Sequence, residues 1–210
     1  MDSSSLTQFR ALYEDGAPVW CTNIARIYCA LANLTGLPTR EVNAAGLYDG
    51  IQFTGHAFAE SYLREQQTWV FVDVASGKAM VTTMDDRPLN SVQLWQQTQL
   101  AEDQPALLAW VYRDGTITQT PYAEARWSEQ EYFGPNTDLL FPPPKSYPLS
   151  FMEKGYHYLL QTNRVWSADP TSLFARQTLQ QLMRLGLLLS SSTILILSLL
   201  RFNRRNLESK

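Results

Sequence analysis

The sequence predicts an α+β fold in which a cysteine-bearing helix packs on an antiparallel sheet, with a transmembrane helix at the C-terminus. Three observations predict it. An apolar-periodic run begins at Cys21, directly after a turn that contains Gly16 and Pro18. Two strand-like segments follow and carry His56 and Asp73. The last observation is an uncharged run of 16 residues near the C-terminus, LGLLLSSSTILILSLL.

The composition indicates one ordinary globular domain plus accessory elements. The chain has 210 residues, of which 45% are hydrophobic and 18% charged, which is enough for a hydrophobic core. The net charge is −3 and the body of the chain has no basic run, so a nucleic-acid partner is not expected. The two cysteines do not form a CxxC pair, and neither a metal site nor another cofactor is expected.

The N-terminal part of the chain predicts two helices and a strand. Serines at 3–5 can cap a short first helix. The cysteine-bearing helix is expected over residues 21–34, because apolar residues recur at helical spacing and Gly36 and Pro38 then stop it. Residues 39–45 are expected to form a strand.

The segment 55–76 predicts a hairpin that brings His56 and Asp73 to one face of a sheet. With an even-length turn, Leu63 pairs with Thr68. Asp73 then lies diagonal to His56 on the same face, about 7–8 Å away at the backbone, within reach of a carboxylate–imidazole hydrogen bond. An odd-length turn without a compensating bulge would place the two side chains on opposite faces.

The later part of the chain predicts further helices and a second hairpin. A helix is expected around residues 94–100, and a hairpin over 107–120 with Asp114-Gly115 as its turn. Another helix is expected over 151–163, and Pro170 at the first position of a long helix leads into the apolar run. The expected organisation is a catalytic domain at 1–150, a helical stalk at 151–184, a transmembrane helix at 185–202 and a basic tail at 203–210.

A thiol at a helix start, facing an imidazole and a carboxylate on a sheet, suits acyl transfer by a cysteine nucleophile. Unpaired amides and the helix dipole favour the thiolate at Cys21, and a nearby His56 would strengthen this as an ion pair. Asp73 would fix the tautomer and orientation of His56. The alternative is a buried inert cysteine, a packed histidine and a strand-end cap. Other candidates receive no catalytic role: Cys29 is expected in the core, His157 at the surface or in packing, and Glu60 in solvent.

The spacing of these residues resembles the transglutaminase-like superfamily core. The superfamily pattern is a cysteine at a helix start, a Gly-Leu-Pro-x-Arg turn, His-Ala-aromatic, and Trp-x-x-x-Asp. Here these are Cys21, residues 36–40, residues 56–58 and residues 69–73. The resemblance covers residues 16–76, although Phe58 stands where the family often has Trp and the region before the cysteine is shorter than usual.

The resemblance implies a papain-like core and a thiol enzyme that acts on amide or related acyl bonds, as a protease, an amidase or a transglutaminase-type acyltransferase. Cys21 would attack, His56 would shuttle the proton and Asp73 would orient His56. The substrate would be a peptide or another amide. Its contacts are expected from three aromatic side chains: Trp20, Phe58 and Trp69. For Trp20 and Trp69 the alternative to a cleft wall is a place in the core.

Two rival functions fit the same residues. One is a catalytically idle binding or assembly module in an envelope or surface-polysaccharide system, with assembly proteins as partners. The other is a cysteine-dependent N-acyltransferase, which would need an acyl-thioester site. Thiol reactivity separates the idle module from the enzymes, because an idle triad need not keep a reactive thiolate.

The uncharged run predicts one membrane span. Its 16 residues fall short of the usual ~20, but flanking apolar residues lengthen it while Arg184 and Arg201 snorkel. The hydroxyls at 190–193 can bond back to the helix backbone. The alternative, a buried core helix, would show a polar stripe.

The basic tail suggests an orientation. It follows the apolar run, so the tail is expected in the cytoplasm and the catalytic domain on the opposite, extracytoplasmic side. Residues 1–16 do not resemble a signal peptide, which leaves a tail-anchored cytoplasmic domain as the alternative.

Overall fold

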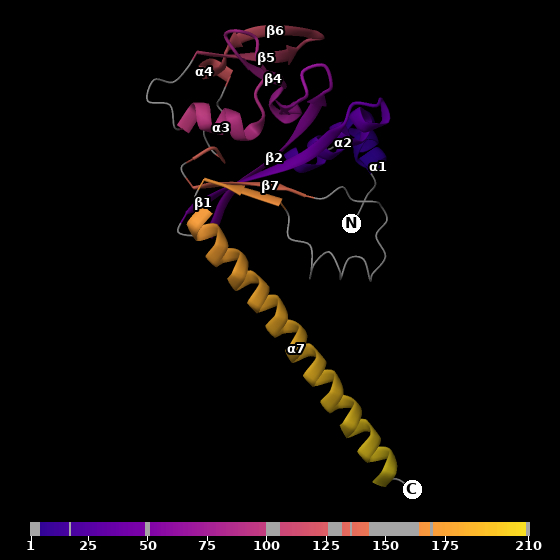
Figure 1. Ribbon diagram of the computed structural model, residues 1–210. Helices are drawn as coiled ribbons and strands as arrows, with labels where there is room; N and C mark the ends of the chain where they lie inside the picture. Colours follow the sequence, from indigo (N-terminus) through magenta and orange to yellow (C-terminus); the bar gives the residue numbers. More distant parts are fainter. Residues whose placement is uncertain are drawn as a thin grey trace. The chain divides into compact units, whose positions relative to one another are not determined.

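The computed structural model describes residues 5–16, 18–48, 51–99, 106–125, 132–134, 136–142, 164–168 and 170–208 (Figure 1). The chain divides into two compact units. Met1–Pro144 together with Asn163–Asp169 form one, and Lys145–Thr162 together with Pro170–Lys210 form the other. The first unit mixes helices with antiparallel sheets, so the α+β class is confirmed.

Two helices begin the first unit. They are α1 (Ser5–Asp15) and α2 (Cys21–Leu34), and α2 has the predicted bounds. The chain leaves α2 through Gly36, whose φ of +84° lies in the left-handed region that favours glycine. Helix α2 packs on strands β1 and β2 through its buried side chains Ala25, Ile27 and Ala32.

The larger sheet has the strand order β3-β2-β1-β7-β8, and every neighbouring pair is antiparallel. Its members are β1 (Thr39–Tyr48), β2 (Ile51–Leu63), β3 (Thr68–Val72), β7 (Thr137–Phe141) and β8 (Arg164–Ser167). Leu63 pairs with Thr68 across the β2–β3 hairpin, and the register continues to Ala59 opposite Val72. The predicted hairpin register is therefore confirmed.

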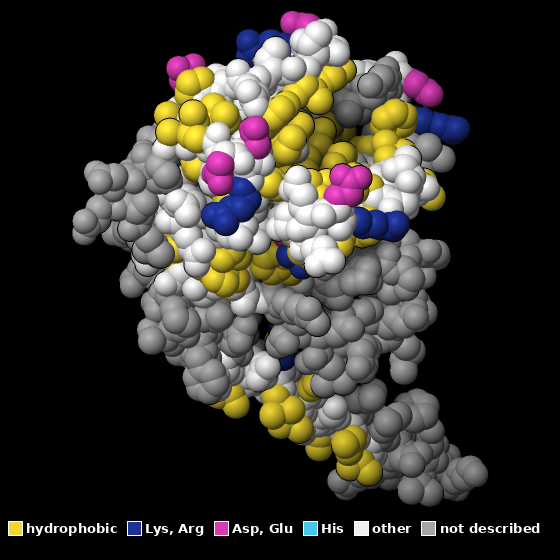
Figure 2. Space-filling view, turned by 45° about the horizontal axis from the view of Figure 1, so that its top comes forward, with side chains coloured by type: hydrophobic (Ala, Val, Ile, Leu, Met, Phe, Trp, Pro, Cys, Tyr) yellow, Lys and Arg dark blue, Asp and Glu magenta, His cyan; other side chains and the backbone are white. Residues whose placement is uncertain are grey.

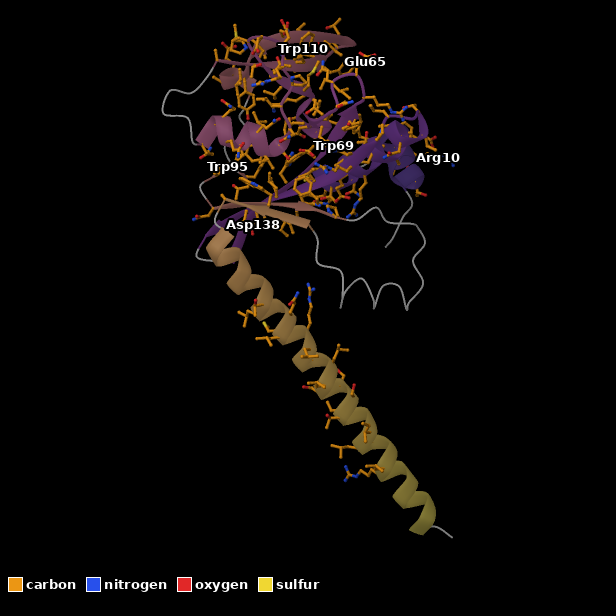
Figure 3. All side chains as sticks on the ribbon, viewed as in Figure 1. Arg10, Glu65, Trp69, Trp95, Trp110 and Asp138 are labelled. Carbon is orange, nitrogen blue, oxygen red and sulfur yellow. The ribbon has the colours of Figure 1, made fainter. Side chains whose placement is uncertain are left out.

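Strand β8 corrects the expectation of a helical stalk over residues 151–184 at residues 164–167, whereas residues 170–184 are helical and belong to α7 (Pro170–Glu208). Arg164–Ser167 instead extend the sheet, where Trp166 lies opposite Leu139. The ring of Trp166 also packs against Trp95, with ring centroids 4.9 Å apart, and Figure 3 labels Trp95 on helix α3. Burial of this aromatic side chain favours the strand. The helix expected at 151–163 lies outside the described residues.

A second sheet has the order β4-β5-β6. Its strands are β4 (Lys78–Thr83), β5 (Leu107–Arg113) and β6 (Thr116–Pro121). The β5–β6 turn has Asp114 at φ 51° and Gly115 at φ 81°, as a two-residue hairpin turn of the primed type requires, so this prediction is confirmed. The short elements around this sheet are η1 (Val74–Ser76), α3 (Ser91–Gln99) and α4 (Tyr122–Ala125).

The main core lies among the two sheets, α3 and α4. Its largest fully buried apolar side chains are Phe58, Phe71, Leu94 and Leu139. Charged side chains of both signs are scattered over the face shown in Figure 2.

Helix α7 (Pro170–Glu208) makes up the described part of the second unit. Within the described residues, its stretch Gln181–Ser198 is long and apolar enough to cross a membrane. None of that stretch is buried. Ser190 Oγ donates to the carbonyl of Gly186 at 2.7 Å and Thr193 Oγ1 to that of Leu189 at 2.8 Å. The expected back-bonding of hydroxyls to the helix backbone is confirmed.

Candidate active site

Cys21 is the first residue of α2. Trp20 occupies the N-cap position in an extended conformation, with φ −80° and ψ 157°. Its indole is a hydrogen-bond donor and cannot accept from the first amides of the helix. Cys21 is a half-buried free thiol, and α2 packs on β2, the strand that carries His56.

His56 and Asp73 meet as the hairpin register predicts. Nε2 of His56 lies 3.0 Å from Oδ2 of Asp73. His56 is half-buried in β2, whereas Asp73 is fully buried just after the end of β3. The carboxylate therefore bonds to Nε2 of the imidazole, and the other ring nitrogen, Nδ1, can bond to another partner.

Asp73 also caps the short helix η1. Ser76 Oγ donates to Oδ2 at 2.6 Å, and Ser76 N donates to Oδ1 at 3.4 Å. Tyr132 Oη donates to Oδ2 at 3.5 Å. Both carboxylate oxygens therefore accept hydrogen bonds, which favours the ionised form of Asp73.

Lys78 completes the surroundings of the carboxylate. Its Nζ donates to Ser76 Oγ at 2.8 Å. The left-handed Gly77, with φ +74°, turns the chain so that the backbones of Asp73 and Lys78 bond to each other at 2.9 and 2.8 Å. A Cβ at position 77 would lie 3.1 Å from the carbonyl oxygen of Tyr112, so glycine suits the turn on two counts.

The pKa values of the pair move in opposite directions. Burial raises the pKa of Asp73, but the hydrogen bond and charge of His56, with Ser76 and Lys78, outweigh burial and hold this pKa below its usual value. Burial lowers the pKa of His56, but Asp73 and then Cys21 outweigh burial and raise this pKa above 6.5. The pair therefore favours carboxylate and imidazolium.

Cys29, two turns further along α2, lies in a different environment. Burial, followed by the nearby charge of Glu41, raises the pKa of its thiol to about 12. A thiol with this pKa is protonated at neutral pH and is a poor nucleophile.

Tyr132 is a member of the site that the sequence did not indicate. Its ring stacks on the imidazole of His56, with centroids 4.6 Å apart and an interplanar angle of 19°. It lies 59 positions from Asp73 in the chain, so no local pattern links the two. Asp73 had a usable signal, because aspartate is a common N-cap residue that accepts from the backbone amide two or three positions later, here Ser76 N.

The three aromatic residues expected to contact substrate have different surroundings. Trp20 is 80% exposed beside Cys21. Phe58 is 1% exposed, so the expected substrate contact is corrected: its ring packs on Phe71 in the core, 4.8 Å between centroids. Trp69, labelled in Figure 3, lies under the guanidinium of Arg40 at 4.1 Å.

Glu60 is a second correction, because it is 0% exposed rather than solvated. Arg40 donates to its Oε2 from Nε and Nη2, at 2.9 and 2.6 Å. Ser91, at the start of α3, donates to Oε1 from its backbone and its hydroxyl. Glu60 therefore joins β1, β2 and the N-terminus of α3. Within the described residues, no group of three His, Cys, Asp or Glu side chains could hold a metal ion.

Comparison with known proteins identifies the part of the chain that carries this geometry. The model of the transglutaminase-like superfamily matches residues 5–74, which confirms the resemblance predicted from the sequence. The match covers 70 of the 210 residues and includes Cys21, His56 and Asp73. No curated protein and no solved structure matches the chain.

Proposed function

We propose, starting from the transglutaminase-like residues 5–74, that this protein is a membrane-anchored thiol enzyme that acts on amide or related acyl bonds. Enzymes of this superfamily are generally cysteine-based acyltransferases or hydrolases. One observation carries the proposal: Nε2 of His56, on the strand against which the helix that begins at Cys21 packs, lies 3.0 Å from Oδ2 of Asp73. We further propose that α2 on its sheet is a papain-like core.

The proposed chemistry begins with the two nitrogens of His56. Asp73 accepts a hydrogen bond from Nε2–H, so the neutral ring presents the lone pair of Nδ1 to the thiol. Transfer of the Cys21 proton to Nδ1 gives a thiolate and an imidazolium. The open end of α2 stabilises the thiolate, and the Asp73 carboxylate stabilises the imidazolium.

The thiolate then attacks the carbonyl carbon of the bound amide. A C–S bond forms, and the carbonyl oxygen becomes an oxyanion, for which the backbone N–H of Cys21 is the candidate donor. The imidazolium of His56 protonates the leaving nitrogen as the C–N bond breaks, and an acyl-thioester remains. Water or an amine attacks that thioester, gives its proton to His56, and releases the thiolate of Cys21.

Helix α7 is the proposed membrane anchor, with the span at 185–202. Its 39 residues extend about 58 Å at ~1.5 Å per residue, roughly twice the ~30 Å of a hydrocarbon core. The apolar window Gln181–Ser198 has no buried residue, as a lipid-facing helix would have. The basic residues at 201–205 support a tail at 203–210 in the cytoplasm and a catalytic domain on the other side.

Labelling of the active thiol tests the proposal. The full chain in native membranes would be treated with a thiol-directed peptidyl acyloxymethyl ketone and mapped by peptide mass spectrometry. We expect the label on Cys21, lost in Cys21→Ser and in His56→Ala, and kept in the matched variant Cys29→Ser. A label that is absent from Cys21 in wild type would contradict the enzyme and favour the idle binding or assembly module.

A further inference from the structure

The hydrogen bonds of the site continue beyond Asp73 to a buried lysine. Nζ of Lys78 donates to Ser76 Oγ at 2.8 Å, and Ser76 Oγ donates to Asp73 Oδ2 at 2.6 Å. Oδ2 in turn lies 3.0 Å from Nε2 of His56. Four side chains therefore form one continuous chain that ends at the imidazole.

The direction of these hydrogen bonds follows from the chemistry of the groups. An ammonium group only donates, so Ser76 Oγ must accept from Lys78. The single hydroxyl hydrogen of Ser76 then points at Asp73, where Oδ2 at 2.6 Å is a nearer acceptor than the backbone carbonyl oxygen at 3.3 Å. Lys78 thus orients the hydroxyl that in turn orients the carboxylate.

Lys78 is buried, and Ser76 is one of the partners of its ammonium group. The residue is 2% exposed, and a buried ammonium is destabilising unless it is paired and hydrogen-bonded. The paired backbones of Asp73 and Lys78 fix it beside the site, at 2.9 and 2.8 Å. The backbone amide of Ser76 holds the other carboxylate oxygen, Oδ1, at 3.4 Å. Rotation of the carboxylate is therefore opposed at both oxygens.

We propose that Ser76 and Lys78 are positioning residues: they aim Oδ2 of Asp73 at Nε2 of His56 and so fix the imidazole tautomer that leaves Nδ1 for Cys21. The role of Nδ1 toward Cys21 rests on the proposed function. The orientation of Asp73 by Ser76 and Lys78 does not, because it rests on their own hydrogen bonds.

Nitrogen NMR of the imidazole tests this role without turnover. The full chain would be labelled with ¹⁵N-histidine in detergent micelles. It has two histidines, and His157→Gln assigns the other one. Above the pH at which His56 titrates, the ¹⁵N shifts report which ring nitrogen carries the hydrogen. We expect the wild type to carry it on Nε2, and Ser76→Ala to give a mixture of tautomers.

The thiol provides a second measurement. In Ser76→Ala, alkylation of Cys21 at about pH 6 should slow by about tenfold, the size of one charge-assisted hydrogen bond. Lys78→Met has a similar length without the charge and should change tautomer and rate in the same direction. Ser76→Thr keeps the hydroxyl and should restore both.

Ser61→Ala is the matched control. Ser61 is a buried serine in β2 whose hydroxyl bonds to Tyr28 Oη and Thr39 Oγ1, both at 3.0 Å. Its loss should leave the His56 tautomer and the Cys21 rate at wild-type values.

Wild-type tautomer and rate in Ser76→Ala would overturn the proposal, as would an equal effect of Ser61→Ala. If Ser76→Ala fails to fold, Lys78→Met decides by the same criteria. A tautomer that responds to Ser76→Ala while wild-type Cys21 is unreactive would support the positioning role and contradict the proposed function.

Discussion

The two cysteines of α2 have different surroundings, so the order in which a thiol reagent modifies them tests the role of Cys21. Cys21 begins the helix that packs on the strand of His56, and it contributes to the raised pKa of that histidine, whereas the pKa of Cys29 is raised to about 12. Iodoacetamide at about pH 6 should therefore modify Cys21 well before Cys29, as read by peptide mass spectrometry. Equal or reversed labelling would remove the catalytic assignment of Cys21.

His56 and Asp73 should differ in how much activity depends on them. Without His56 no group accepts and returns the proton, so His56→Ala should abolish turnover of an amide substrate. Asp73→Asn keeps the base but mis-sets its tautomer, and should leave a trace of activity, about 10⁴-fold below wild type. His157→Ala should remain near wild type. If it lost as much as His56→Ala, the assignment of the base would be wrong.

The opposed pKa directions of the pair predict how its contribution to stability depends on pH. The raised pKa of His56 gives stability that is complete below about 6.5 and is lost as pH rises through the folded-state value. The lowered pKa of Asp73 gives stability that is complete above about 3.8 and is lost as pH falls through the folded-state value.

The thermal midpoint of wild type should therefore exceed that of Asp73→Asn most between about pH 4 and 6.5, and the difference should shrink on both sides. The same substitution should lower the pKa of His56, which a histidine NMR titration would read directly. A difference in midpoint that is constant from pH 3 to 9 would contradict the ion pair.

The geometry of this pair could be predicted from the sequence, whereas Tyr132 could not. His56 and Asp73 belong to one hairpin, so strand periodicity and one turn length fix their relation. Tyr132 reaches the pair from a distant segment, and only the folded chain brings it there. Phe58 shows a related limit: its place after His56-Ala57 in the motif does not reveal that its side chain faces the core.

At the scale of elements, predictability followed the strength of local signals. Helix α2 has a helical period and a Gly/Pro stop, and its predicted bounds agree with the structure. Strand β8 has four residues, too few for a clear period of two, and its structure depends on its pairing with β7. Short strands of this kind gain their stability from partners that the local sequence does not contain.

The contacts of Glu60 with Arg40 of β1 and Ser91 of α3 predict how substitutions there change the free energy of unfolding. Glu60 is wholly buried, whereas the side chain of its partner Arg40 is 37% exposed. Arg40→Met would leave a buried carboxylate without its cation, and should lower the free energy of unfolding by about 3 kcal/mol. Glu60→Gln should cost less, because the remaining guanidinium can be hydrated.

Chemical denaturation would measure both changes, with Glu65→Ala as the control. Glu65 is exposed in the β2–β3 turn (Figure 3), and its loss should change the free energy of unfolding by less than about 0.5 kcal/mol. A larger loss in Glu60→Gln than in Arg40→Met would contradict the argument from exposure.

At the scale of the whole molecule, β8 determines how far the chain can be shortened from its C-terminus without loss of the fold. The strand belongs to the compact unit that contains the site, although it follows the proline-rich sequence FPPPKSYP of residues 141–148. A chain that ends at residue 169 keeps β8 and lacks α7, so it should fold and be soluble. A chain that ends at residue 150 loses β8 and the packing of Trp166 on Trp95, and should be less stable.

The full chain should behave as a membrane protein anchored by α7. Its apolar window Gln181–Ser198 has no buried residue within the described structure, so lipid is the expected surroundings. Carbonate or high salt should therefore leave the full chain in the membrane, and detergent should release it, whereas the chain ending at 169 should stay in the soluble fraction. Release of the full chain by carbonate alone would contradict the span.

The side of the membrane on which the domain lies is tested separately, by protease protection. The basic residues after the span predict a cytoplasmic tail and a domain on the opposite side. Protease added to intact cells should then digest the domain, after the outer membrane is opened where the cell has two. An epitope added after Lys210 should remain protected until the inner membrane is broken. If the domain were protected and the epitope digested in intact cells, the tail-anchored cytoplasmic arrangement would replace the proposed one. Protection of both until the inner membrane is broken would contradict the span itself, because a single span places the domain and the tail on opposite sides of the membrane.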